Sequence, residues 1–346
     1  MKKGLFHILL FVSLLAESFA QDIHFSQYYN SPLQLNPAHA GGFGKVQAIL
    51  NYKDQWKSVA GVPFRTYAGS VDFQVTKKKW RTGYMGVGLM FFSDKAGDGA
   101  MGTTHGSVSV ASFRKLDRKN SLSAGLQFGF TQRSVNFSAF TWDTQFDGMN
   151  YNASYPTGEG VSGAGKFLIM DVGLGAVWNF DKGEQYTTAN NGLKAKAGFS
   201  VFHLNRPYYS FLGSGSERQY MKFVVHSSTA IGIKNTLGTV IPTLVVFKQG
   251  PLKEITFGGL YKIILVRDSK ITGYIKSSYL YFGGHYRWRD SFIASMHFDV
   301  GNWGLGFSYD INVSKLRIAS TFRGGFEVSL RFHTLDDYMF SPSSRF

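Results

Sequence analysis

The sequence contains no cysteine, and after its first twenty residues it has no apolar run of the roughly 18 residues that a membrane-spanning helix needs. The HExxH, P-loop and GxSxG motifs are also missing. These absences exclude a disulfide-stabilised scaffold, a cysteine nucleophile and a membrane protein built from apolar helices. We therefore expect no cofactor and no enzymatic activity.

The first twenty residues have the pattern of a secretion signal. Lys2 and Lys3 precede an apolar stretch, Leu5–Leu15, and the small residue Ala20 stands directly before Gln21. A single transmembrane helix is the alternative, but the apolar run is short and polar residues follow it at once. We expect cleavage between Ala20 and Gln21, which would place the mature chain outside the inner membrane.

The rest of the chain is dominated by an alternation of large apolar residues with small or polar ones. The stretch 302–313, NWGLGFSYDINV, shows it best, because Trp303, Leu305, Phe307 and Tyr309 fall on one side of an extended strand. In a soluble β-sandwich the apolar side would face a core, whereas in an outer-membrane barrel it faces lipid and the polar side lines the lumen. A mean hydropathy of −0.11, 40 glycines and 16% aromatic residues fit the barrel.

We count about fourteen such segments, at the spacing of antiparallel hairpins. They fall at 45–53, 64–76, 82–93, 103–114, 121–134, 167–180, 194–204, 219–233, 238–248, 254–264, 277–288, 291–300, 302–313 and 324–333. The predicted fold class is all-β, a transmembrane antiparallel up-and-down β-barrel that occupies residues 45–346 as one domain. Residues 21–44 do not alternate and contain two prolines, which predicts an irregular N-terminal segment that packs against the barrel or plugs it.

The lengths of the connections predict how the barrel is oriented. If the N-terminus lies in the periplasm, connections after odd-numbered strands face outside and should be longer. The connection at 135–165 fits, but the one at 289–290 is too short for an outside loop. Those at 181–193 and 265–276 are long for periplasmic turns, so the alternation of lengths holds in only part of the chain.

The formal net charge of +15 at pH 7 would suggest a nucleic-acid partner in a cytosolic protein. The predicted signal peptide removes that interpretation, so no nucleic acid is expected. The bases lie in connections such as 77–79 and 114–119, which is typical of a solvated rim that faces lipid headgroups. Attraction to an acidic partner or to acidic lipopolysaccharide is the alternative.

Candidate functional residues on the strands are carboxylates. Asp171, Asp299 and Asp310 fall on the polar sides of their segments. Lumen carboxylates paired with bases such as Arg65 or Arg331 are the simpler interpretation, and a catalytic carboxylate set of the outer-membrane protease kind is the alternative. The histidines of the mature chain are dispersed without the i, i+2 or i, i+4 spacing of a metal site, so no metal is expected.

The segment 202–207, FHLNRP, places His203, Asn205 and Arg206 directly before Pro207. The pattern indicates a strand that leads into a loop. Either the strand ends because Pro207 blocks further ladder bonding, or the loop binds a partner, and the sequence alone leaves both interpretations open.

One further observation concerns the order of short motifs along the mature chain. They are QDIHFSQYYNSPLQLNPAHAGG (21–42), GVGLMFFSDKAG (86–97), LSAGLQFGF (122–130), DVGLGAVW (171–178), GFSVFHLNRP (198–207), FKQG (247–250), GGHYRWRDSF (283–292) and LGFSYDIN (305–312). Together, and in this order, they resemble the PorP/SprF family, which comprises membrane components associated with the type IX secretion and gliding machinery of Bacteroidetes. The ordered set covers nearly the whole mature chain and carries the resemblance better than any single motif.

The resemblance implies an integral outer-membrane barrel of a Gram-negative bacterium that supports secretion or cell-surface anchoring of one adhesin. The implied partners are a secreted surface protein with a type IX C-terminal domain, periplasmic secretion-ring components, and outer-membrane lipid and lipopolysaccharide. The family has no known catalytic residues, so none is carried over, and the segment 135–165 is the expected place of cargo specificity. The alternative is a diffusion porin or small-molecule uptake channel, since about fourteen strands can enclose a lumen.

Overall fold

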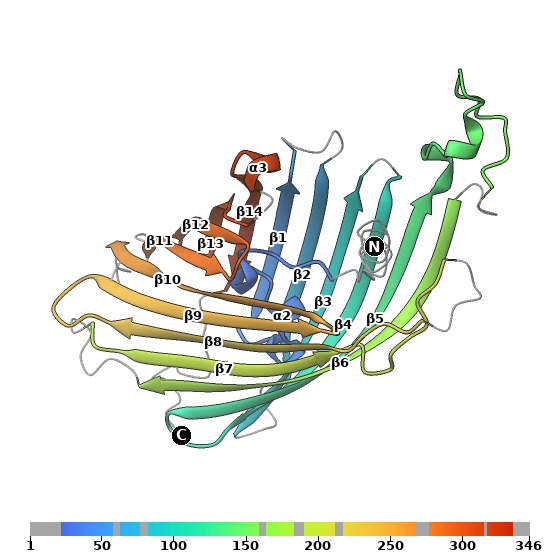
Figure 1. Cartoon of the computed structure of the whole chain (residues 1–346). Helices are drawn as coiled ribbons and strands as arrows, with labels where there is room; N and C mark the ends of the chain where they lie inside the picture. The colour runs from blue at the N-terminus through green and yellow to red at the C-terminus, as the bar shows by residue number, and fades with distance from the viewer. Residues whose placement is uncertain are drawn as a thin grey trace, which may run out of the picture.

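Fourteen antiparallel strands form a closed barrel in the computed structural model (Figure 1). The structure describes residues 22–57, 63–76, 82–97, 99–158, 164–182, 190–211, 217–266, 277–314 and 317–334. The strands are β1 (Val46–Gln55), β2 (Phe64–Thr76), β3 (Gly83–Ala96), β4 (Met101–Lys115), β5 (Asn120–Asn136), β6 (Ala164–Lys182), β7 (Leu193–Phe202), β8 (Lys222–Gly232), β9 (Gly238–Gln249), β10 (Leu252–Val266), β11 (Ser278–Arg287), β12 (Ser291–Val300), β13 (Trp303–Asn312) and β14 (Arg323–His333). Consecutive strands pair with one another, and β1 pairs with β14, which confirms the predicted fold class.

The alternating sequence pattern decides which side chains face outward. In β13, Trp303 is 55% exposed, and Phe307 also points away from the lumen. Ser308 and Asp310, on the opposite side of the same strand, are buried inside the barrel. The same alternation of exposed apolar and buried polar residues recurs around the barrel, as expected of strands that pass through lipid. None of the helices in the described part of the chain is long and apolar enough to cross a membrane.

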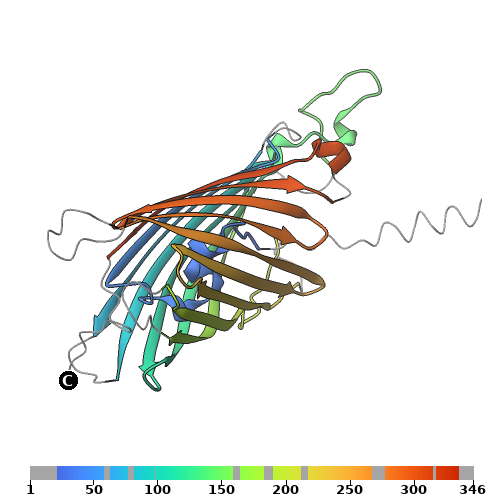
Figure 2. The same ribbon diagram turned by 90° about the vertical axis from the view of Figure 1, so that its left-hand side faces the viewer.

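The two ends of the barrel differ. We call the end that carries the connections after odd-numbered strands the loop end, and the end where β1 begins and β14 finishes the base. Residues 137–158 (green), with η3 (Phe137–Ala139) and η4 (Asp143–Gln145), project beyond the loop end, which also carries α3 (Arg317–Ser320) (Figures 1 and 2). The connection 288–290 is short, as expected from the sequence, and 250–251 is also short, so the predicted alternation of loop lengths is wrong at 250–251. The connections at 181–193 and 265–276 lie largely outside the described residues.

Residues 22–44, which we call the N-terminal segment, lie inside the barrel (Figure 2). They form three short helical turns, η1 (Tyr28–Asn30), α2 (Pro32–Leu35) and η2 (Pro37–His39). Proline begins α2 and η2, where its missing N–H costs no helical hydrogen bond, and the Asn36 side chain caps η2 by accepting from Ala38 N at 2.9 Å. The segment starts among side chains of the loop end and reaches the base, where Lys45 N donates to Thr334 Oγ1 at 2.9 Å.

Two glycines of the barrel wall allow the N-terminal segment to lie directly on the strands. A Cβ at Gly125 in β5 would lie only 2.5 Å from the backbone nitrogen of Ala38. A Cβ at Gly175 in β6 would overlap the side chain of Asn36. With hydrogen in place of a side chain, Asn36 comes close enough for its amide to donate to the carbonyl of Ala176 at 3.1 Å. The small inward-facing residues therefore shape the surface on which the segment packs.

Candidate functional site

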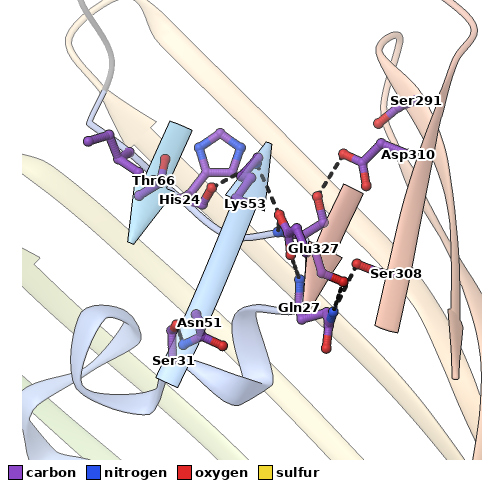
Figure 3. Close-up of polar contacts among 12 residues, drawn as sticks. His24, Gln27, Ser31, Asn51, Lys53, Thr66, Ser291, Ser308, Asp310 and Glu327 are labelled. Carbon is purple, nitrogen blue, oxygen red and sulfur yellow. Dashed lines mark hydrogen bonds and ion pairs between the residues drawn. The ribbon is translucent and has the colours of Figure 1, made fainter. Parts of the chain in front are cut away.

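The carboxylate of Glu327 binds the start of the N-terminal segment. Glu327 lies on the inner face of β14, directly opposite Lys53 of β1, and both side chains are buried. Its two oxygens accept from the backbone nitrogens of Ser26 at 2.7 Å and Gln27 at 2.9 Å (Figure 3). Lys53 Nζ lies 3.1 Å from Glu327 Oε1 and donates to the His24 carbonyl at 3.0 Å. One buried carboxylate thus receives three charge-assisted contacts, the strong class of hydrogen bond.

A second carboxylate, Asp310 on β13, extends this arrangement. Ser26 Oγ donates to Asp310 Oδ2 at 2.7 Å, and Arg287 on β11 contacts both Asp310, at 3.1 Å, and Ser26 Oγ, at 2.6 Å. Gln27 adds a bond from its side-chain amide to Ser308 Oγ at 3.1 Å. We call Ser26, Gln27, Lys53, Asp310 and Glu327 the Glu327 cluster; it ties the N-terminal segment to the strands on either side of the barrel closure.

Further hydrogen bonds hold the N-terminal segment along its length. They are Asn30 Nδ2 to Ser329 Oγ at 2.7 Å, Asn51 Nδ2 to Asn30 O at 2.9 Å, Ser200 Oγ to Leu35 O at 2.7 Å, Gly41 N to Asp72 Oδ2 at 2.9 Å and Tyr84 OH to Gly41 O at 3.1 Å. The partners come from β1, β2, β3, β7 and β14, so these bonds fix the segment to five of the fourteen strands. Two apolar clusters, around Leu33 and around Leu35, pack between the segment and the inner wall.

A histidine at the loop end is held between two carboxylates. His203 Nδ1 lies 2.8 Å from Asp171 Oδ1, and its Nε2 lies 2.5 Å from Asp22 Oδ2. Gln219 Nε2 contacts both Asp22 Oδ1, at 3.3 Å, and His203 Nε2, at 3.2 Å. We call Asp22, Asp171, His203 and Gln219 the His203 cluster. It fixes the first described residue of the N-terminal segment at the loop end.

The two carboxylates favour the protonated imidazole. Burial by itself would lower the pKa of His203, but the charge of Asp22 and the hydrogen bonds with Asp171 and Asp22 raise it to about 9. Burial would likewise raise the pKa of Asp22, but the charges of His203 and Lys222 hold it well below its ordinary value of 3.8. The cluster therefore contains a buried imidazolium at neutral pH.

The raised pKa of His203 makes the stability of the protein depend on pH. The stabilisation is complete below the ordinary pKa of 6.5 and is lost as the pH rises through about 9. The stabilisation that Asp22 contributes depends on pH in the opposite direction. It is present above pH 3.8 and is lost as the pH falls through the lowered pKa of Asp22. Between about pH 6 and about pH 10 we expect a loss of roughly 3 kcal/mol in the free energy of unfolding, measured by urea titration in detergent.

The matched control for this prediction is His203→Gln, which keeps a hydrogen-bonding side chain and removes the titration. Its free energy of unfolding should be nearly constant over the same alkaline range. A variant that loses as much stability as the unmodified protein between these two pH values would show that another group causes the loss.

The structure brings some of the residues predicted from sequence together and separates others. Asp171 and His203 share the His203 cluster, and Asp310 belongs to the Glu327 cluster. Asp299 instead pairs with Arg331, at 2.7 Å, so the three aspartates occupy three different settings and do not form one catalytic set. Arg65 pairs with Asp54 near the loop end, and not with any of these aspartates.

The FHLNRP segment differs in detail from its prediction. The strand ends at Phe202, because His203 takes a positive φ of 58°, so Pro207 is not what stops the ladder. Asn205 Nδ2 donates to the Met170 carbonyl at 2.7 Å, which ties the loop to β6. Arg206 has an exposed side chain at the loop end. Neither residue contacts the N-terminal segment through a bond that the structure records.

Sequence reasoning missed the residues that do most to hold the N-terminal segment. Glu327 falls on the polar side of the segment 326–333, but the sequence predicts neither its role nor those of Lys53, Ser26, Gln27 and Arg287. The pairing of Lys53 with Glu327 could have been expected from the sequence. The first and last strands of a barrel must pair with each other, and each of these two strands carries a charged residue on its inner side. The backbone N–H groups of Ser26 and Gln27 could not be identified as donors from the sequence, because every residue except proline has one.

These features define a class: a transmembrane β-barrel with an apolar outer surface whose lumen is crossed by its own N-terminal segment. Residues 17–332 match the PorP/SprF family, described as type IX secretion system membrane proteins. The match covers most of the chain, and the chain therefore belongs to this family. The barrel and the family together support a location in the outer membrane and a role as a component of a secretion system. A comparison with curated proteins gives no match.

Solved structures with a similar fold include other barrels. The translocator domain of autotransporter NalP from Neisseria meningitidis has a TM-score of 0.37 and 11% identity, over 85% of this chain and 90% of that one. BamA from Haemophilus ducreyi lacking POTRA domains 1–3 has a TM-score of 0.41 and 12% identity, over 84% of this chain and 70% of that one. The CymD monoaromatic hydrocarbon channel has a TM-score of 0.41 and 8% identity, over 88% of this chain and 93% of that one. Such low values say nothing about shared function.

Proposed function

We propose that this barrel supports the secretion or cell-surface anchoring of one adhesin that carries a type IX C-terminal domain. The observation that carries the proposal is the N-terminal segment, which crosses the lumen and is bonded to the wall from the loop end to the base. We infer that residues 21–44 act as a plug, which leaves no wide path for diffusion. A plugged barrel in a secretion-system family is better suited to hold a partner at its surface than to pass solutes.

The projecting segment 137–158 is the proposed contact for this partner. Its conformation is fixed internally, since the buried Gln145 donates to the Tyr155 carbonyl at 3.0 Å and Asp147 accepts from the backbone nitrogens of Met149 and Asn150. Met149 is nevertheless 86% exposed, and Phe146 is exposed as well. Exposed apolar side chains on a preorganised loop are typical of a binding surface, because little entropy is lost on contact.

The orientation of the barrel follows from this proposal. The loop end faces outward toward the cargo, and the base faces the periplasm, where secretion-ring components would bind. Residues 1–20 lie outside the described residues; we propose that they are a signal peptide removed between Ala20 and Gln21, which the N-terminal mass of the purified protein would test. Outer-membrane lipid and lipopolysaccharide surround the strands.

Deletion of the gene tests the proposed function. Surface display of one partner adhesin should disappear while other type IX cargo is still secreted, because the barrel serves one partner and not the translocation step itself. Display is measured by antibody labelling or protease shaving of intact cells. Re-expression of the barrel with residues 137–158 replaced by a short glycine-serine linker should fail to restore display, whereas the unmodified barrel should restore it. Unchanged display in the deletion strain would refute the proposal.

A diffusion porin or uptake channel is the alternative function. The observation in its favour is the number of strands, since a barrel of 14 strands is wide enough to enclose a water-filled lumen if the segment moves out. Conductance across planar bilayers separates the two functions. A barrel that holds a partner should show no conductance, whereas a porin should show stepwise conductance.

A further inference from the structure

A cavity at the loop end lies between the N-terminal segment and the inner faces of β3 to β8. Its polar lining includes Arg133, Gln219 and Lys222, and its apolar lining includes Ile23, Phe92 and Phe202. Its volume is about 50 Å³, and about 520 Å³ when the space that opens to solvent is included, so a ligand held there would extend into the open mouth. The cavity adjoins the His203 cluster but is not filled by it.

Two polar groups at this cavity are not satisfied by the protein. Arg133 Nε is buried and has no hydrogen-bond partner among the described residues, and the same is true of Gln219 Oε1. The guanidinium of Arg133 lies 5.1 Å from the ring centre of Tyr209 and makes no ion pair with any carboxylate of the described chain. Buried polar atoms nearly always have a partner in folded proteins, so an unpaired guanidinium nitrogen at a cavity indicates a ligand position.

The charges of the residues that line the cavity do not balance. Arg133, Lys222 and the protonated His203 are three cations, and Asp22 and Asp171 are two carboxylates, so one positive charge remains. Lys222 Nζ lies 3.8 Å from Asp22 Oδ2, whereas Arg133 makes no ion pair within 4 Å in the described part of the chain and only the more distant charges of Asp22 and Asp94 act on it. An anionic group with two oxygens in one plane matches the fork of a guanidinium.

The lining of the cavity also contains aromatic rings. Phe92 stacks on the ring of His105 with 4.9 Å between ring centres, and His105 Nδ1 lies 2.7 Å from Thr131 Oγ1. Phe202 is buried at the end of β7. A ligand that reached Arg133 with a charged group would place its remaining atoms against these rings. The lining is thus suited to a molecule that is anionic at one end and apolar at the other.

We propose that this cavity binds a carboxylate attached to an apolar group, with Arg133 and Lys222 holding the carboxylate and Phe92 and Phe202 contacting the apolar part. The ligand is either a free organic acid or the C-terminal residue of a polypeptide, since both present the same chemistry. The inference goes beyond the proposed function, because it concerns the lumen mouth and not the projecting segment 137–158.

Calorimetry with the full-length protein in phosphatidylcholine nanodiscs tests this site. The probes are 3-phenylpropionate and its amide, and a five-residue peptide ending in phenylalanine with a free or an amidated C-terminus. At least one acid should bind, and its amide should bind about tenfold more weakly or worse, because the amide cannot form the charge-assisted pair. Binding of the free acid alone identifies a small-molecule site, and binding of the peptide alone identifies a site for a C-terminus.

Variants separate this site from general charge effects. Arg133→Gln should weaken binding of the acid about tenfold or more, and Lys222→Gln should weaken it as an independent check. The control is Arg65→Gln, which removes one positive charge from the loop end away from the cavity and should leave binding unchanged. Equal binding of acid and amide, full affinity in a folded Arg133→Gln barrel, or no binding of any probe would overturn the proposal. Heat-modifiable migration on gels establishes that each variant is folded.

Discussion

Removal of residues 22–41 is expected to turn a silent barrel into a conducting one. The N-terminal segment fills the lumen through contacts with strands on all sides, and the wall behind it is lined with polar side chains such as Asp72, Gln127 and Ser329. Water would hydrate these side chains once the segment is absent. The truncated chain should therefore still form the closed fourteen-stranded barrel. Planar-bilayer recordings should show stepwise conductance for the truncated protein and none for the unmodified protein.

The control for this experiment shortens the projecting segment instead. A barrel that lacks residues 144–154 keeps the N-terminal segment and all its contacts, so it should remain silent. Stepwise conductance of the unmodified protein, equal to that of the truncated one, would show that the segment does not block the lumen and would favour the porin function.

The second large effect is expected from Glu327→Gln. The substitution leaves the buried Lys53 without its anion and weakens the bonds from the backbone nitrogens of Ser26 and Gln27. Removing one partner of a buried ion pair typically costs about 3–5 kcal/mol, since the remaining charge stays desolvated. We expect a loss of that size in the free energy of unfolding, together with faster hydrogen exchange in residues 25–31.

A double variant distinguishes the ion pair from simple loss of packing. Lys53→Gln combined with Glu327→Gln removes both charges at nearly the same volume, so it should recover part of the stability that Glu327→Gln loses. Glu217→Gln, which changes an exposed residue at the loop end, should have no measurable effect. A double variant less stable than either single variant would contradict the ion-pair interpretation.

The barrel could be predicted from the sequence because its signal is local. Each strand alternates within itself, as in 302–313, and fourteen such segments fix the architecture without any knowledge of which residues touch. The predicted bounds of β5 and β6 differ from the observed ones by only a few residues. The inward side of each strand could also be identified, since large apolar residues must face lipid in a membrane barrel.

The binding of the N-terminal segment could not be predicted in the same way. Ser26 and Gln27 use backbone nitrogens, and their partner Glu327 lies at the other end of the chain. The predicted end of β7 lies two residues beyond the observed one, because the strand stops where His203 takes a positive φ and not at Pro207. Long-range polar contacts of this kind have no periodic signature.

Affinity purification from detergent-solubilised outer membranes shows whether the projecting segment 137–158 holds a surface protein. The tagged barrel and a variant with residues 137–158 replaced by a short linker are purified in parallel, and the co-purifying proteins are identified by mass spectrometry. We expect one large surface protein with a type IX C-terminal domain to accompany the unmodified barrel and to be lost from the linker variant, while periplasmic ring components remain with both. Recovery of the barrel alone, or of the same surface protein with both forms, would contradict this expectation.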